Sequence, residues 1–323
     1  MRQHFYPKLA FIGMVKNKKF YLPYLLTCLG MVAMYYIVSF LSTNQTLADT
    51  PGGGQMQAIL GFGCGVIAVF AFIFLFYTNS FLLRRRKKEF GLYNILGMNK
   101  KNLAHILAWE CLFTALLALL GGIFCGMLFA KLGELLMVHI LAGQTSFSFS
   151  IDPAVIGKTV LLFGVIFGVI FLNALRQIHL TNPIALLHSE ALGEKPPKAN
   201  WLLAILGLIL LLGAYYLAVT IQDPLSTLLL FFVAVIMVIL ATYLLFIAGS
   251  VVMCKLLQKR KKYYYKANHF VSISSMIFRM KRNGAGLASI CILSTMVLVM
   301  ISSTSCLYIG SEDSLSNQYP RDI

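Results

Sequence analysis

The chain has 323 residues, of which 59% are hydrophobic and 12% charged, and its formal net charge at pH 7 is +16. Soluble domains usually carry about 25% charged residues, so these values exclude a water-soluble fold and require lipid to solvate much of the surface. A strongly basic chain is also typical of nucleic-acid-binding proteins, but here the positions of the charges along the chain favour a membrane protein without nucleic acid.

Seven segments are apolar enough, over the length of about 20 residues that a membrane-spanning helix needs, to cross a bilayer. In chain order they are 20–41, 58–83, 103–130, 155–175, 201–221, 225–251 and 287–309. Only Gln222-Asp223-Pro224 separates the fifth segment from the sixth, which predicts a tight hairpin. The predicted fold is therefore an all-α polytopic membrane protein with about seven transmembrane helices.

The basic residues alternate between the two sides of this predicted topology. If the N-terminus is cytoplasmic, five basic residues precede the first span, seven follow the second, three follow the fourth and nine follow the sixth. Only three of the 27 basic residues then fall outside: Lys131, Lys158 and Arg321. Lysine and arginine accumulate in cytoplasmic loops, so this asymmetry predicts a cytoplasmic N-terminus in a bacterial plasma membrane. The lipid bilayer itself, with its anionic inner surface, is the first partner that we expect.

Two moderately apolar stretches with helical spacing precede the first and the last span. We expect both to be amphipathic helices on the inner membrane surface. The basic flanks and one cysteine that follow them recur at a constant offset: Lys16, Lys18, Lys19 and Cys28 correspond to Arg279, Lys281, Arg282 and Cys291. This weak repeat favours two related halves.

The segment between the second and third spans, from Arg84 to Glu110, is the most informative part of the chain. Its basic run fits an ordinary cytoplasmic loop, but the residues after that run do not. Residues 89–98 read EFGLYNILGM, which predicts a short amphipathic helix with glycine breaks. Because such a helix is too short to span and too apolar for a solvated loop, we expect it to pack against the membrane or a partner protein.

The pattern E-F-G-L-Y-x-x-x-G-M-x-K from Glu89 to Lys100, followed by Glu110 in the third span, resembles the signature of FtsX-like ABC transporter permeases. The end of the fourth span is also similar to that family: Arg176 is followed by N-P-I-A-L-L at 182–187. The arrangement of the spans, with a helical hairpin joining two halves, most resembles the bacitracin-resistance (Bce-type) permeases. Those permeases continue past the seventh helix, so we expect this chain to hold one complete half and the beginning of a second.

The resemblance implies a division of the chain and a set of site residues. The expected parts are a cytoplasmic amphipathic helix (1–19), a permease half with four spans (20–190), a two-helix connector (200–251), the start of a second half (265–310) and the start of an extracellular segment (311–323). In this family the loop between the second and third helices touches the ATPase. The residues expected at that interface are Glu89, Phe90, Gly91, Leu92, Tyr93, Gly97 and Met98.

The resemblance also implies partners. We expect an ABC ATPase subunit acting as a homodimer, which would bind the ATP, and a membrane histidine kinase. The chain itself is then a transport subunit without enzymatic activity or a cofactor of its own. The sequence offers no CxxC or paired-histidine metal motif and no nucleophile–base set.

Glu110 lies within the third predicted span, where an acidic residue is costly and marks a functional candidate. Its nearness to Lys100, Lys101 and His105 also allows a purely structural ion pair.

Three functions remain open from the sequence. The first is an ABC permease that removes or exports an antimicrobial peptide such as bacitracin, or a lipid-linked substrate. The second is a sensory or mechanotransmission module that signals to a histidine kinase or a cell-wall enzyme without transport. The third is an ion-coupled carrier, which Glu110 alone hardly supports because such carriers place several ionisable groups near mid-membrane.

Overall fold

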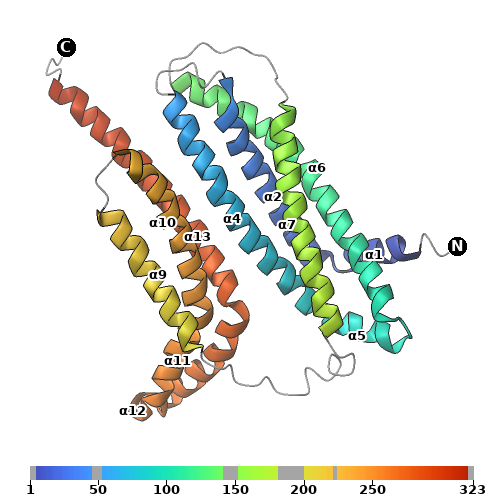
Figure 1. Cartoon of the computed structure of the whole chain (residues 1–323). Coiled ribbons are helices and arrows are strands. Elements are labelled where there is room, and N and C mark those ends of the chain that lie inside the picture. The colour runs from blue at the N-terminus through green and yellow to red at the C-terminus, as the bar shows by residue number, and fades with distance from the viewer. Residues whose placement is uncertain (1–4, 46–52, 141–151, 181–199, 221–223, 319–323) are drawn as a thin grey trace. The chain divides into compact units, whose positions relative to one another are not determined.

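The computed structural model describes residues 5–45, 53–140, 152–180, 200–220 and 224–318. Every regular element in these ranges is a helix (Figure 1). In chain order they are α1 (Phe5–Lys16), α2 (Lys18–Thr43), α4 (Gly53–Arg85), α5 (Lys87–Ile95), α6 (Lys100–Ile140), α7 (Pro153–Leu180), α9 (Trp201–Thr220), α10 (Pro224–Leu244), the π-helical turn η2 (Leu245–Gly249), α11 (Ser250–Lys259), α12 (Lys261–Tyr264) and α13 (Ala267–Gln318).

Seven helices in the described ranges are long and apolar enough to cross a membrane, and each overlaps one predicted span. The all-α, seven-span prediction is thereby confirmed. The predicted hairpin residues before Pro224 lie outside the described ranges, and Pro224 itself is the first residue of α10. Proline suits that position because a first-turn N–H would have no partner within the helix.

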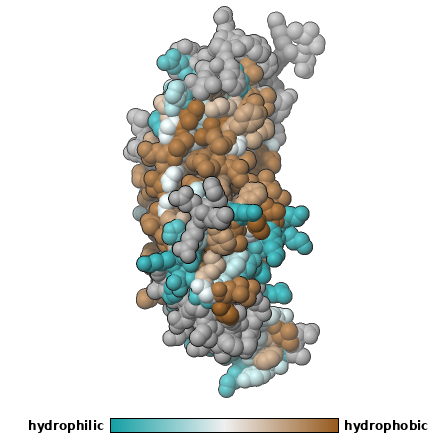
Figure 2. Space-filling view, turned by 90° about the vertical axis from the view of Figure 1, so that its right-hand side faces the viewer, coloured by the Kyte–Doolittle hydropathy of each residue, from teal (hydrophilic) through white to brown (hydrophobic). Residues whose placement is uncertain are grey.

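The helices form two compact units, one containing α1 to α7 and the first part of α10, the other containing α9, the rest of α10 and all later helices. In the first unit the long helices α2, α4, α6 and α7 run side by side, and the short helices α1 and α5 lie at the same end (Figure 1). Figure 2 shows a broad hydrophobic band over the middle of the face it presents, with hydrophilic residues gathered toward the lower part. Such a band is expected of a surface solvated by lipid.

Close packing of α2 on α6 builds the centre of the first unit. A Cβ atom added at Gly122 would lie 2.6 Å from the Cβ of Val32, and one at Gly126 would lie 2.9 Å from the Tyr36 ring. Glycines that admit a neighbouring helix this closely are typical of helix contacts in membranes. Of the three GxxxG pairs in the sequence, only Gly122 and Gly126 serve in this way, since nothing lies within 4 Å of the other four positions.

One face of α1 packs against α6, with Ala10 and Gly13 buried. Its other face keeps Phe5, Ile12 and Val15 exposed. A bilayer surface suits exposed apolar side chains of this kind, as expected for the helix before the first span.

In the second unit, α13 contacts the π-helical turn. A Cβ atom added at Gly284 would lie 2.8 Å from the carbonyl oxygen of Phe246. The Tyr243 hydroxyl lies 2.9 Å from Ser289 Oγ, which adds a polar contact between α13 and the end of α10, just before the turn. The predicted surface stretch before the last span is not a separate helix: it forms the first part of α13, packed through Ile273 and Ile277 on Cys254.

Candidate functional site

The segment between α4 and α6 folds as the short helix α5, as its sequence predicts. The chain leaves α4 at Arg86 and enters α5 one residue later. Glu89 lies in the first turn of α5, where a carboxylate favours the positive end of the helix dipole. After Ile95 the helix ends, and Gly97 adopts a positive φ of 88°, which a glycine accepts at low cost.

The two faces of α5 differ in their surroundings. Phe90 points inward and packs with Leu83, Leu103, Leu107 and Ala174 from three neighbouring helices. Leu92, Ile95 and Leu96 point outward and are 52%, 62% and 71% exposed. We call these three residues the α5 surface. One face of this helix is packed on neighbouring helices, and the other exposes apolar side chains. Such a helix is suited to bind a partner protein that buries the exposed face.

The structure divides the seven predicted interface residues by accessibility. Leu92 and Gly97 are exposed, and Glu89, Tyr93 and Met98 are half-buried. Phe90 and Gly91 are buried, so they position the helix and offer little surface of their own. Gly91 lies within α5 and does not break it, contrary to the expected glycine break, whereas Gly97 follows its end.

Tyr93 is partly buried and packs against the apolar cluster that contains Phe90. Its burial, reinforced by the nearby carboxylate of Glu89, raises the pKa of its hydroxyl above the ordinary value. The phenol therefore stays neutral under all ordinary conditions and acts as an apolar ring with one polar tip.

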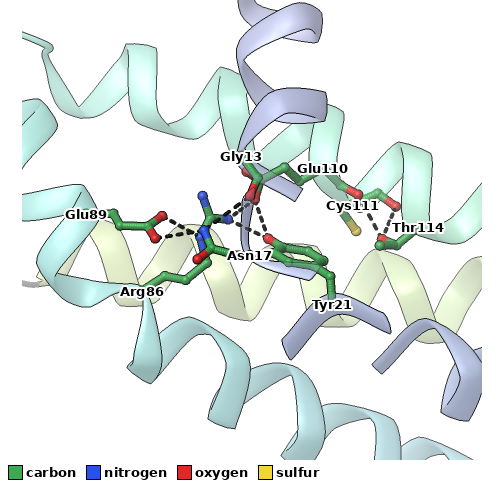
Figure 3. Close-up of polar contacts among 8 residues, drawn as sticks. All are labelled: Gly13, Asn17, Tyr21, Arg86, Glu89, Glu110, Cys111 and Thr114. Atoms are coloured by element: carbon green, nitrogen blue, oxygen red, sulfur yellow. Dashed lines mark hydrogen bonds and ion pairs between the residues drawn. The ribbon is translucent and has the colours of Figure 1, made fainter. Parts of the chain in front are cut away.

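Glu110 is 3% exposed inside α6, and its carboxylate faces Arg86, which is 2% exposed. The Tyr21 hydroxyl donates a hydrogen bond of 2.8 Å to the same oxygen, Oε2, that contacts the guanidinium (Figure 3). The sequence had offered Lys100, Lys101 or His105 as ionic partners, and the structure corrects this to Arg86. Those three residues precede Glu110 on its own helix, whose about 3.6 residues per turn direct their side chains elsewhere.

Arg86 has several partners at once. Its Nε donates to Glu89 Oε2 at 2.9 Å, and its Nη1 donates to Glu110 and to the Tyr21 hydroxyl. Burial opposes the guanidinium charge and is the largest single effect, but Glu110, Tyr21 and Glu89 together outweigh it, so the pKa of Arg86 is raised above its ordinary value. A buried charge held by an opposite charge and further hydrogen bonds is the arrangement that burial of an ion pair requires.

The turn between α1 and α2 completes the group. Asn17 donates from Nδ2 to Glu89 Oε1 at 2.7 Å and to the carbonyl of Gly13 at 3.1 Å. We call Asn17, Tyr21, Arg86, Glu89 and Glu110 the polar cluster. It joins side chains from α2, α5, α6 and the residues between them (Figure 3). A small cavity lies beside it, lined by residues of α2, α4, α6 and α7, among them Asn79 and Thr114.

Sequence reasoning missed three members of this cluster. Arg86 was counted only as one of five consecutive basic residues, and no periodicity separates it from Arg85. Tyr21 and Asn17 lie at the start of an apolar helix, where polar side chains are common. The one available signal was Glu110 itself, because an intramembrane carboxylate needs a cationic partner from some other helix.

These features define a class of protein: a multi-pass helical membrane protein in which a short helix between two spans is held by a buried ionic cluster and presents an apolar surface. Residues 61–183 match the family described as FtsX-like permease C-terminal. The chain therefore contains an FtsX-like permease region, which confirms the resemblance carried by residues 89–100.

Individual relatives of the chain are named as permeases. The chain is 31% identical over 206 residues to an uncharacterized ABC transporter permease, YvcS, of Bacillus subtilis. These aligned residues cover 63% of this chain and 32% of the relative. The chain is 26% identical over 319 residues to the bacitracin export permease protein BceB of Halalkalibacterium halodurans, covering 95% of this chain and 49% of the relative. BceB of Bacillus subtilis is 23% identical over 207 residues, 63% of this chain and 32% of the relative.

The chain thus spans about half or less of the length of these relatives. The similarity to BceB of Halalkalibacterium halodurans nevertheless extends over nearly all of this chain, beyond the region matched by the family. The predicted motif at 182–187 and the linker around it lie outside the described residues.

Proposed function

We propose that this chain is the permease subunit of an ABC transporter and that its α5 surface docks a separate ATPase subunit, which binds and hydrolyses the ATP. The observation that carries the proposal is the exposure of Leu92, Ile95 and Leu96 on a helix whose opposite face is fixed. The relatives named as permeases support the assignment to the permease subunits.

The α5 surface has the properties of a docking element. Three exposed apolar side chains on one short helix can enter a hydrophobic groove, as amphipathic helices commonly do. Exposed arginines, Arg84 and Arg85, lie just before α5 and would supply the polar rim of such a contact. Because Phe90 and the polar cluster fix α5, docking requires little ordering of the permease.

The remaining parts of the proposal follow from this arrangement and from the relatives. The N-terminus and α5 lie on the cytoplasmic side, where the ATPase dimer and its ATP are found. The substrate is an antimicrobial peptide of the bacitracin kind or a lipid-linked molecule, by analogy with the two relatives named for bacitracin export. A membrane histidine kinase is a further partner of the same proposal.

Co-purification tests the docking. The full chain, carrying an affinity tag, is co-expressed with a candidate ABC ATPase subunit from the same genome. Leu96→Asp and the double change Leu92→Asp with Ile95→Asp are expected to abolish capture of the ATPase, because each places a charge in an apolar contact. Tyr265→Asp is the matched control. Tyr265 has the same exposed fraction as Leu96, 71%, but it follows α12 and lies outside the α5 surface.

Equal capture by all of these variants would contradict docking at α5. Growth in bacitracin then tests the substrate: cells with the wild-type pair should tolerate more bacitracin than cells with the Leu96→Asp pair. Capture and ATP hydrolysis without any change in tolerance would remove bacitracin-like peptides from the proposal and leave the subunit assignment in place.

A further inference from the structure

We propose that Arg86 is a positioning residue that passes movement of α5 to α2 and α6 and so couples the docked ATPase to the spans. This inference rests on the proposed function, because it assumes that an ATPase acts on α5. Neither the family match nor the names of the relatives assign a role to this residue.

Arg86 lies at the junction of α4 and α5 and bonds to three other elements. Its Nε donates to Glu89 of α5 at 2.9 Å, while Nη1 donates to Glu110 of α6 and to the hydroxyl of Tyr21 of α2 (Figure 3). Its guanidinium also lies 5.4 Å from the Tyr21 ring centre and 5.1 Å from that of Phe90. A planar guanidinium with several fixed donors suits such a junction, whereas a lysine offers only one point charge.

Glu89 is fixed at both of its oxygens. Oε2 accepts from Arg86, and Oε1 accepts from Asn17 at 2.7 Å. A displacement of the first turn of α5 must therefore move Arg86 and the α1–α2 turn with it, or break charge-assisted hydrogen bonds.

The cluster leaves little room for α5 to slide. Gly13 of α1 closes one side, because a Cβ atom there would lie 3.3 Å from Arg86 Nη2 and 3.4 Å from Glu110 Oε1. The apolar contacts of Phe90 would alone permit small rotations, since burial of apolar surface has no direction. The hydrogen bonds of Arg86 have direction and are buried, where separating the charges is most costly. They set one position of α5 relative to α2 and α6.

Three variants separate coupling from stability: Arg86→Gln, Glu110→Gln and the double change. Each is purified as the full chain with its ATPase in lipid nanodiscs, in a background without the native cysteines. A fluorescent maleimide on Leu132→Cys reports on the opposite end of α6, where Leu132 is 54% exposed. The measurements are thermal unfolding, ATPase capture and the change in fluorescence on adding ATP with vanadate. Arg279→Gln is the control, because Arg279 is an exposed cation on α13, outside both the α5 surface and the polar cluster.

Each single change is expected to lower thermal stability because it removes one charge of a buried ion pair and leaves the other charge in place. The double change is expected to recover much of that stability, since no charge then remains buried without its counterpart. All three should capture the ATPase, because the α5 surface is intact, yet all three should lose the nucleotide-dependent change at residue 132. Arg279→Gln should keep this change.

A stable double variant that captures the ATPase and retains the full fluorescence change would overturn the role of Arg86 while leaving the proposed function standing. If the double amide variant does not accumulate, Arg86→Met with Glu110→Met gives the same comparison with an apolar pair. Failure of the wild-type chain to capture the ATPase would overturn both the proposed function and this inference.

Discussion

Tyr21 of α2 and Glu110 of α6, 89 positions apart in the sequence, are joined by a buried hydrogen bond of 2.8 Å. Tyr21→Phe removes only the hydroxyl and leaves a buried carboxylate with one donor fewer. We expect the free energy of unfolding to fall by about 1–3 kcal/mol, as for loss of a hydrogen bond to a charged group. Thermal unfolding in detergent measures this. Tyr35→Phe, which keeps its ring contact with Phe163, should change stability less.

The contact between α2 and α6 depends on Gly122. In Gly122→Ala the new methyl would lie 2.6 Å from Val32 Cβ and 3.0 Å from the Leu29 carbonyl oxygen, so backbone or side chain must move. Overpacking of this kind typically costs about 1–3 kcal/mol, and we expect a matching loss of thermal stability.

Gly168→Ala on α7 is the control for Gly122→Ala, because nothing lies within 4 Å of the position. It should leave stability unchanged or raise it by up to about 1 kcal/mol, the difference in helix propensity between glycine and alanine. Equal changes of thermal stability in the two variants would contradict a close contact between α6 and α2 at Gly122.

The turn from α5 into α6 depends on the conformation of Gly97, whose φ is 88°. Gly97→Ala should destabilise this turn by about 1–2 kcal/mol, because a Cβ atom disfavours the left-handed region. Amide hydrogen exchange of residues 87–99 is expected to speed up. Gly97→Asn should behave more like the wild type, since asparagine tolerates that region better than alanine does. Slower exchange in the alanine variant would contradict the assigned turn.

The orientation can be tested by labelling from each side of the membrane. In a cysteine-free background, Leu96→Cys should react with a membrane-impermeant maleimide only after the cells are opened, because α5 is expected to be cytoplasmic. Gln55→Cys, at the other end of α4, should react in intact cells. The reverse pattern would invert the topology and remove the basis for docking a cytoplasmic ATPase.

The sequence predicted the seven spans well because each follows from a local property, a run of apolar residues about 20 long. The short helix at 87–95 was likewise predictable from its pattern of residues. The ion pair of Glu110 with Arg86 was not, because it joins residues of different helices and depends on how α4, α5 and α6 pack. Packing also decided which glycine pair serves as a contact: Gly122 and Gly126 meet α2, whereas Gly164 and Gly168 of the same pattern meet nothing within 4 Å.

The accessibility of the predicted interface residues also lay beyond the sequence. Phe90 and Leu92 are both apolar and only two positions apart, yet one is buried and the other is 52% exposed. The hydrophobic pattern predicts an amphipathic helix but does not tell which apolar side chains a neighbouring helix will cover.

The helix α13 runs without a break over 52 residues. At about 1.5 Å per residue it is nearly 80 Å long, more than twice the thickness of the hydrocarbon core. A stiff rod of this length converts a slight tilt near its start into a displacement of several ångströms at its far end. By contrast, the helix before the first span is interrupted at Asn17, between α1 and α2, and the chain of the first unit can bend there. In the second unit the corresponding stretch and the last span form one continuous helix, α13.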